Sequence, residues 1–183
     1  AAPFKDSGEL DIESTKKLID FYIEKGVNGI TILGVMGEAP KLTAEESKIF
    51  LKTVIKQVNN QVPVIVGVSN PGIDNLIDLA NFSMDADAAG VMIAPPPGIG
   101  TEEKLYNYLA NTLDKLDAQI PVCYQDYPFF TKTEISVATF NKIIGEYDQV
   151  VMFKHEEWPG LNKLSRIRYS SDKGDTRRVS ILT

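Results

Sequence analysis

The sequence has little of what disulfide frameworks, metal cages and nucleic-acid grooves require. It contains one cysteine, Cys123, and one histidine, His155, among 183 residues. An internal disulfide is therefore excluded, a metal cage of Cys and His ligands is poorly supplied, and a reducing compartment is favoured. The net charge is −6 and no basic cluster occurs, which argues against a nucleic-acid partner. We expect no metal site and no nucleic-acid binding.

Long apolar stretches are also missing. No run approaches the roughly 20 apolar residues that span a bilayer, and residues 1–6 lack the basic and apolar regions of a signal peptide. These absences favour a cytoplasmic protein without membrane attachment. Hydrophobic residues make up 43% of the chain, enough for one sizeable core, and no linker interrupts it. We expect a single domain over residues 1–183.

Short apolar runs alternate with helical patterns along the chain, which is typical of the α/β class. Each run is nearly continuous, as expected of parallel strands that are buried on both faces. The runs cover residues 29–33, 64–68, 89–94, 121–124, 149–153 and 179–182, with the tail of a further strand at 1–4. Helices are expected after the start signals at Asp11, Thr43, Asn70, Thr101, Ser136 and Leu161.

The interval between strands is about 30 residues, the length of a βαβ unit. Two architectures have this repeat, an open doubly wound sheet and a (β/α)8 barrel. No G-x-G-x-x-G follows the first full strand, so a dinucleotide crevice is not indicated. A complete barrel usually needs about 250 residues. A barrel built from this chain would therefore be incomplete, with roughly strands 2–7 and the end of strand 1, and truncated at both ends.

Functional groups collect at the carboxyl ends of the strands in either architecture. Lys154 directly follows the apolar run at 150–153. A lysine at the mouth of an apolar barrel is partly desolvated, which favours the neutral amine that attacks a carbonyl. The alternative is a strand that simply ends there, with the ammonium group in water.

Other polar groups follow the remaining strands. The turn at 34–38 offers backbone N–H groups that suit a carboxylate, although an ordinary βα turn has the same pattern. His155 fits a surface or supporting role better than acid–base catalysis, and Cys123 fits the core. Asp126 and Glu156 are either acid–base groups or solvated loop carboxylates.

Several motifs, in order, resemble one family. The matching segments are 2–4 (A-P-F), 26–39 (G-V-N-G-I-T-I-L-G-V-M-G-E-A), 42–46 (L-T-A-E-E), 62–68 (V-P-V-I-V-G-V), 85–91 (D-A-D-A-A-G-V), 94–96 (A-P-P) and 150–154 (V-V-M-F-K). As a set they resemble the dihydrodipicolinate synthase and N-acetylneuraminate lyase family of lysine-dependent class I aldolases. The chain resembles a fragment of a divergent member of that family.

The resemblance implies a (β/α)8 barrel in which Lys154 condenses with a 2-oxo acid, usually pyruvate, to give a protonated imine. The imine serves as an electron sink while a carbon–carbon bond forms or breaks, so no separate cofactor is implied. Relatives are commonly tetramers, which implies a homotetramer for the full-length protein. By position, Val35, Met36 and Gln125 take the places of substrate-binding residues of the family.

These positions also depart from the family pattern. Val35 and Met36 stand where the family has hydroxyl residues that bind the substrate carboxylate and relay protons. Gln125 stands in place of the proton-shuttling tyrosine, and strand alternation turns the adjacent Tyr124 to the other face. Two phenylalanines at 129–130 occupy the stretch in which the synthase carries an arginine.

We therefore expect a Schiff-base lyase or aldolase that acts on a 2-oxo acid but not on the synthase's substrate pair. One alternative is 4-hydroxy-tetrahydrodipicolinate (dihydrodipicolinate) synthase itself, against which the departures argue. The other is a non-catalytic barrel that binds a small acid, which the missing hydroxyl groups suggest.

Overall fold

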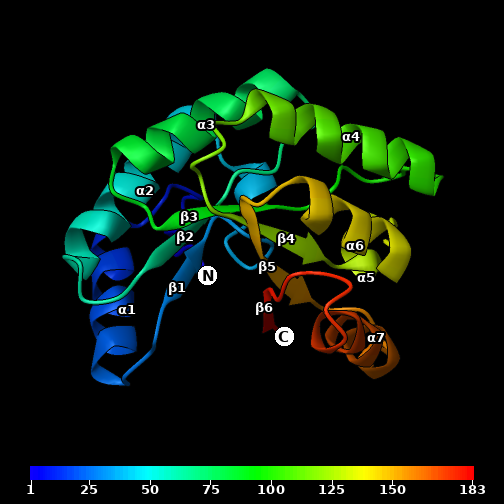
Figure 1. Cartoon of the computed structure of the whole chain (residues 1–183). Coiled ribbons are helices and arrows are strands. Elements are labelled where there is room, and N and C mark those ends of the chain that lie inside the picture. The colour runs from blue at the N-terminus through cyan, green and yellow to red at the C-terminus, as the bar shows by residue number, and fades with distance from the viewer. The chain divides into compact units, whose positions relative to one another are not determined.

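The computed structural model describes residues 1–183, and Figure 1 labels its helices and strands. The helices are α1 (Ile12–Glu24), η1 (Ala39–Lys41), α2 (Ala44–Val58), α3 (Ile73–Asp85), α4 (Glu102–Lys115), α5 (Pro128–Thr131), α6 (Val137–Glu146) and α7 (Leu161–Asp172). The strands are β1 (Ile30–Ile32), β2 (Val64–Gly67), β3 (Gly90–Ile93), β4 (Val122–Asp126), β5 (Val150–His155) and β6 (Ser180–Leu182). No helix is both long and apolar enough to cross a bilayer.

The strands follow one another in a single sheet in the order β1-β2-β3-β4-β5-β6. The pairs β1·β2, β4·β5 and β5·β6 are parallel. A doubly wound sheet reverses its strand order at a switch point, whereas a (β/α)8 barrel adds each strand beside the previous one. The observed order therefore excludes the doubly wound alternative.

The chain forms two compact units. Unit 1 comprises Ala1–Val68 and Asp74–Val91, and unit 2 comprises Ser69–Ile73 and Met92–Thr183. The expectation of a single domain over 1–183 stays a prediction.

In unit 1, the turn after β1 lies against the end of β2. A Cβ atom on Gly67 would lie 2.1 Å from the carbonyl oxygen of Leu33, so only glycine permits this approach. The predicted capping box at the start of α2 is present, with Thr43 and Glu46 bonding reciprocally to each other's backbone N–H. The predicted tail of a strand at residues 1–4 is reduced to one isolated bridge, Phe4 with Leu10.

In unit 2, the residues of β4 and β5 alternate between two faces. Tyr124 pairs with Phe153 in the strand register, and their rings lie parallel with centroids 6.1 Å apart. Both rings also contact Phe140 of α6, so this face is covered by that helix. Gln125 and Lys154, the next pair in the register, point to the opposite face. The prediction that Tyr124 and Gln125 face opposite ways is confirmed.

Strands β4 and β5 both extend two residues beyond their predicted ends. The prediction stopped where the apolar run stopped, but Asp126 and His155 are paired in the register and buried. His155 Nδ1 and Asp126 Oδ2 are partners, so two buried polar side chains are paired where the apolar runs have ended. Asp126 is therefore not a solvated loop carboxylate, and His155 does not lie at the surface.

Candidate active site

Three side chains of unit 2 meet at the carboxyl ends of β4 and β5. Lys154 Nζ donates a hydrogen bond to Glu156 Oε2 at 2.6 Å. Gln125 Nε2 donates to the same oxygen, also at 2.6 Å. The Lys154 and Glu156 side chains are 21% and 29% exposed, so both are only partly in contact with solvent.

The strand register brings these groups together. Gln125 is the partner of Lys154 on the neighbouring strand, and Glu156 lies two residues further along the chain from Lys154. The backbone N–H of Glu156 donates to the carbonyl of Asp126 at 2.8 Å, which continues the ladder for one more residue. Since residues i and i+2 of an extended chain share a face, Glu156 lies on the Lys154 face. Sequence reasoning left Glu156 undecided, although the Lys-x-Glu spacing at a strand end was the available signal.

A second polar cluster lies on the opposite face of the same strands. His155 Nδ1 lies 3.0 Å from Asp126 Oδ2, and Lys163 Nζ donates to the same oxygen at 3.0 Å. His155 Nε2 lies 3.2 Å from the carbonyl oxygen of Gly160. A Cβ atom on Gly160 would lie 2.3 Å from His155 Nε2, so glycine permits this contact. We refer to Asp126, His155, Glu157 and Lys163 as the buried cluster.

The groups of the buried cluster perturb one another. Burial raises the pKa of Asp126 above its ordinary value, although Lys163 and His155 act in the opposite direction. Burial lowers the pKa of Lys163, but the carboxylates of Glu157 and Asp126 together raise it above its ordinary value. The charged form of Asp126 is therefore stabilised by Lys163, and the charged form of Lys163 is stabilised by Asp126 and Glu157.

Three members of the buried cluster have the chemistry of metal ligands. One ligand atom from each of Asp126, His155 and Glu157 lies within 4.8 Å of the others. The ammonium group of Lys163, however, contacts both Asp126 and Glu157. These oxygens thus already have a cationic partner inside the protein. The expectation of no metal site stays a prediction.

The turn with Val35 and Met36 belongs to unit 1. It is tight, because Gly37 N–H donates to the carbonyl of Gly34 at 3.1 Å and Glu38 N–H donates to the carbonyl of Val35 at 3.0 Å. Two of the N–H groups proposed for a substrate carboxylate are therefore used within the turn. Met36 is 77% exposed. That Val35 and Met36 bind substrate together with Lys154 and Gln125 stays a prediction.

A cavity of about 470 Å³ lies beside Glu156 in unit 2. Its lining is aromatic and acidic and consists of Tyr127, Pro128, Phe129, Glu134, Glu156, Glu157 and Trp158. The sequence drew attention to Phe129 only because it occupies a stretch in which the synthase carries an arginine. The cavity adjoins Lys154 through Glu156, which contacts the amine and also lines the cavity.

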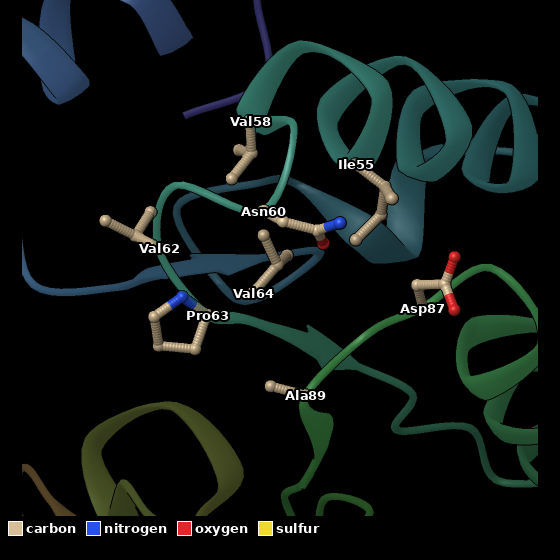
Figure 2. Close-up of a pocket in the computed structure, with 8 residues that line it drawn as sticks. All are labelled: Ile55, Val58, Asn60, Val62, Pro63, Val64, Asp87 and Ala89. Carbon is tan, nitrogen blue, oxygen red and sulfur yellow. The ribbon is translucent and has the colours of Figure 1, made fainter.

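Figure 2 shows a smaller cavity, which lies within unit 1. Eight residues line it: Ile55, Val58, Asn60, Val62, Pro63, Val64, Asp87 and Ala89. Val64 begins β2 and Ala89 precedes β3, so the cavity lies at the amino ends of these strands. Catalytic groups of (β/α)8 barrels lie at the opposite, carboxyl ends. We assign no chemistry to this cavity.

Comparison with known proteins shows the family of this chain. Residues 1–174 match the model of the dihydrodipicolinate synthetase family. The chain belongs to this family. Among its members, the 4-hydroxy-tetrahydrodipicolinate synthase of Aquifex aeolicus is 30% identical over 166 residues, which are 90% of this chain and 55% of the relative. That of Nitrosospira multiformis is 33% identical over 135 residues, 73% of this chain and 44% of the relative.

Solved structures of family members show the same fold. Dihydrodipicolinate synthase from Rhodopseudomonas palustris superposes with a TM-score of 0.95 and 41% identity, covering 99% of this chain and 60% of that one. The chain therefore has the fold of an incomplete (β/α)8 barrel, as predicted. It spans about half the length of the curated relatives that it matches.

Proposed function

We propose that the protein is a Schiff-base-forming lyase or aldolase that acts on pyruvate or another 2-oxo acid, with Lys154 as the nucleophile. The observation that carries this proposal is the position of the Lys154 amine. It lies at the carboxyl end of β5, only partly exposed, and it contacts a carboxylate at 2.6 Å. Family membership supports the same chemistry.

The site suits attack on a carbonyl. The neutral amine of Lys154 adds to the carbonyl carbon of the 2-oxo acid, and loss of water gives a protonated imine. The positive nitrogen then accepts the electron pair released when a bond at the adjacent carbon breaks. Gln125 is buried next to the amine and can hydrogen-bond but cannot transfer a proton as a phenol does.

Borohydride trapping tests this proposal. Pyruvate and borohydride together are expected to add one reduced adduct to the complete protein, at Lys154, as read by mass spectrometry of peptides. Lys154→Arg keeps the charge and is expected to lose the adduct. Lys132→Arg, which changes an exposed lysine of unit 2, is the matched control and is expected to keep it. A protein that gains no adduct with pyruvate or any other 2-oxo acid would refute the proposal.

The synthase activity is the second candidate, because the similar relatives carry that name. It predicts consumption of aspartate semialdehyde that depends on pyruvate. Adduct formation without this consumption would leave a lyase with a different partner aldehyde. Binding of a small acid that stabilises Lys154→Arg as well as the unchanged protein, without any adduct, would instead indicate a non-catalytic barrel.

We also propose a cytoplasmic location and a homotetramer for the complete protein. The composition supports the location, since one cysteine excludes internal disulfides. Family membership supports the assembly. Sedimentation of the complete protein measures the assembly directly.

A further inference from the structure

Imine formation at a lysine requires proton transfer at two points. The balanced reaction converts an ammonium group and a carbonyl into a protonated imine and one water molecule. Two protons therefore leave the nitrogen and appear on the departing oxygen. A group that carries protons between these two atoms must reach Nζ and must itself be able to exchange a proton.

Three nearby groups fail one of these conditions. Gln125 contacts the site but has no exchangeable acid proton. Tyr124 lies on the face covered by α6, and burial raises its pKa well above the ordinary value. Asp126 lies on that same face, where its Oδ2 is engaged by His155 and Lys163.

Glu156 meets both conditions. Its Oε2 accepts a hydrogen bond from Lys154 Nζ at 2.6 Å, within the range for direct proton transfer. A second hydrogen bond, from Gln125 Nε2 at 2.6 Å, fixes the carboxylate in place. Its side chain also lines the cavity that adjoins the site, so it stands between the amine and the space open to a substrate.

We propose that Glu156 is the proton-transfer residue for imine formation at Lys154. This inference rests on the proposed function, because it requires Lys154 to form an imine. Gln125 acts as a positioning residue that orients the Glu156 carboxylate rather than as a direct ligand of the substrate.

The proposed steps balance. Glu156 first takes a proton from the Lys154 ammonium group, and the freed electron pair of the nitrogen forms the bond to the carbonyl carbon. The carbonyl π electrons move to the oxygen, which receives that proton from Glu156. The carboxylate then takes a second proton from the nitrogen and passes it to the hydroxyl group. The C–O bond breaks, water leaves, and the nitrogen electron pair completes the C=N bond.

The test measures the rate of adduct formation with pyruvate, by quenching with borohydride at successive times and reading the intact mass. Glu156→Gln keeps the size and polarity of the side chain but cannot carry a proton. We expect its rate to fall by about 100-fold, in the usual range for general acid–base catalysis. Glu156→Ala is expected to be similarly slow and to recover speed with increasing formate, a small carboxylate that fits the vacated space. Glu103→Gln, which changes an exposed carboxylate of unit 2 away from this cavity, is the matched control and is expected to keep the normal rate.

The outcomes separate this inference from the proposed function. Absence of an adduct in the unchanged protein would overturn both. A normal adduct in the unchanged protein and a rate within twofold in Glu156→Gln would overturn only the role of Glu156. A slow Glu156→Ala variant that formate fails to accelerate would also overturn the role of Glu156. That result would show that the Glu156 carboxylate only holds the structure of the site, a function that free formate does not replace. Slow variants with formate-dependent recovery would establish the role of Glu156.

Discussion

At the residue scale, the alternation of side chains along β5 determines which groups lie next to Lys154. Consecutive residues of β5 point to opposite faces, so Lys154 and Glu156 share one face while Phe153 and His155 share the other. Two sets of ionisable groups can therefore lie within a few residues of each other without mixing. Lys154 and Glu156 are partly exposed, whereas Asp126 and His155 are buried and Lys163 of α7 contacts Asp126.

Cys123 gives a residue-scale prediction. Burial raises the pKa of its thiol to about 12, whereas an unfolded thiol ionises at about 8.5. Since the thiolate is the reactive form, we expect iodoacetamide at pH 8 to label the native protein at least about 100-fold more slowly than the protein in urea. Mass spectrometry of the single cysteine measures both rates. Comparable labelling in the two states would show that Cys123 is accessible, in conflict with its buried position in β4.

At the element scale, the buried cluster connects β4, β5 and α7. Asp126 ends β4, His155 ends β5 and Lys163 lies in the first turn of α7. The cluster thus joins three elements with charge-assisted hydrogen bonds. Because Gln125 and Lys154 precede Asp126 and His155 on the same strands, the cluster also holds the strand ends that carry the site.

At the element scale, we predict that removing the positive charge of Lys163 destabilises the fold. Lys163→Met leaves the buried Asp126 carboxylate with less compensation, and we expect a loss of about 3 kcal/mol in the free energy of unfolding at pH 7. Urea unfolding measures it. Lys173→Met, which changes an exposed lysine just after α7, is the control and is expected to cost little.

The pH dependence of that loss has a definite sign. Asp126 already has a raised pKa, and removing Lys163 raises it further because a nearby positive charge is gone. The folded variant therefore binds a proton at Asp126 more readily than the unfolded chain does. Its deficit should shrink as the pH falls through the folded pKa of Asp126. If the loss of unfolding free energy in Lys163→Met stays constant as the pH falls through the pKa of Asp126, the loss comes from packing and not from charge.

At the scale of the whole molecule, the division into two units bears on stability. Unit 1 contains β1 and β2, and unit 2 contains β4, β5 and β6, while β3 begins in one and ends in the other. The prediction of a single domain over residues 1–183 implies that the two units unfold together.

Hydrogen exchange read by mass spectrometry tests that prediction. Peptides from α2 in unit 1 and from α6 in unit 2 are expected to lose protection at the same urea concentration, because a single domain unfolds in one cooperative step. Two separate midpoints would instead identify the units as independently stable parts.

The chain by itself determined most of the fold. The six apolar runs became six strands, and the start signals at Asp11, Thr43, Thr101 and Ser136 became helix N-caps. These features depend on local chemistry, since periodicity and capping involve residues close in sequence. The end of an apolar run also drew attention to Lys154, but its role as the nucleophile came from the family resemblance and stays a prediction.

The tertiary structure decided which groups the polar residues near Lys154 contact. The sequence left Glu156 and Asp126 equivalent, as two carboxylates near strand ends. The register of β4 against β5 and the packing of α7 place Glu156 on the lysine and Asp126 on His155. Lys154 and Glu156 lie two residues apart in one segment, whereas Asp126 and His155 are 29 positions apart and meet because β4 pairs with β5. The proposed role of Glu156 rests on this difference in contacts.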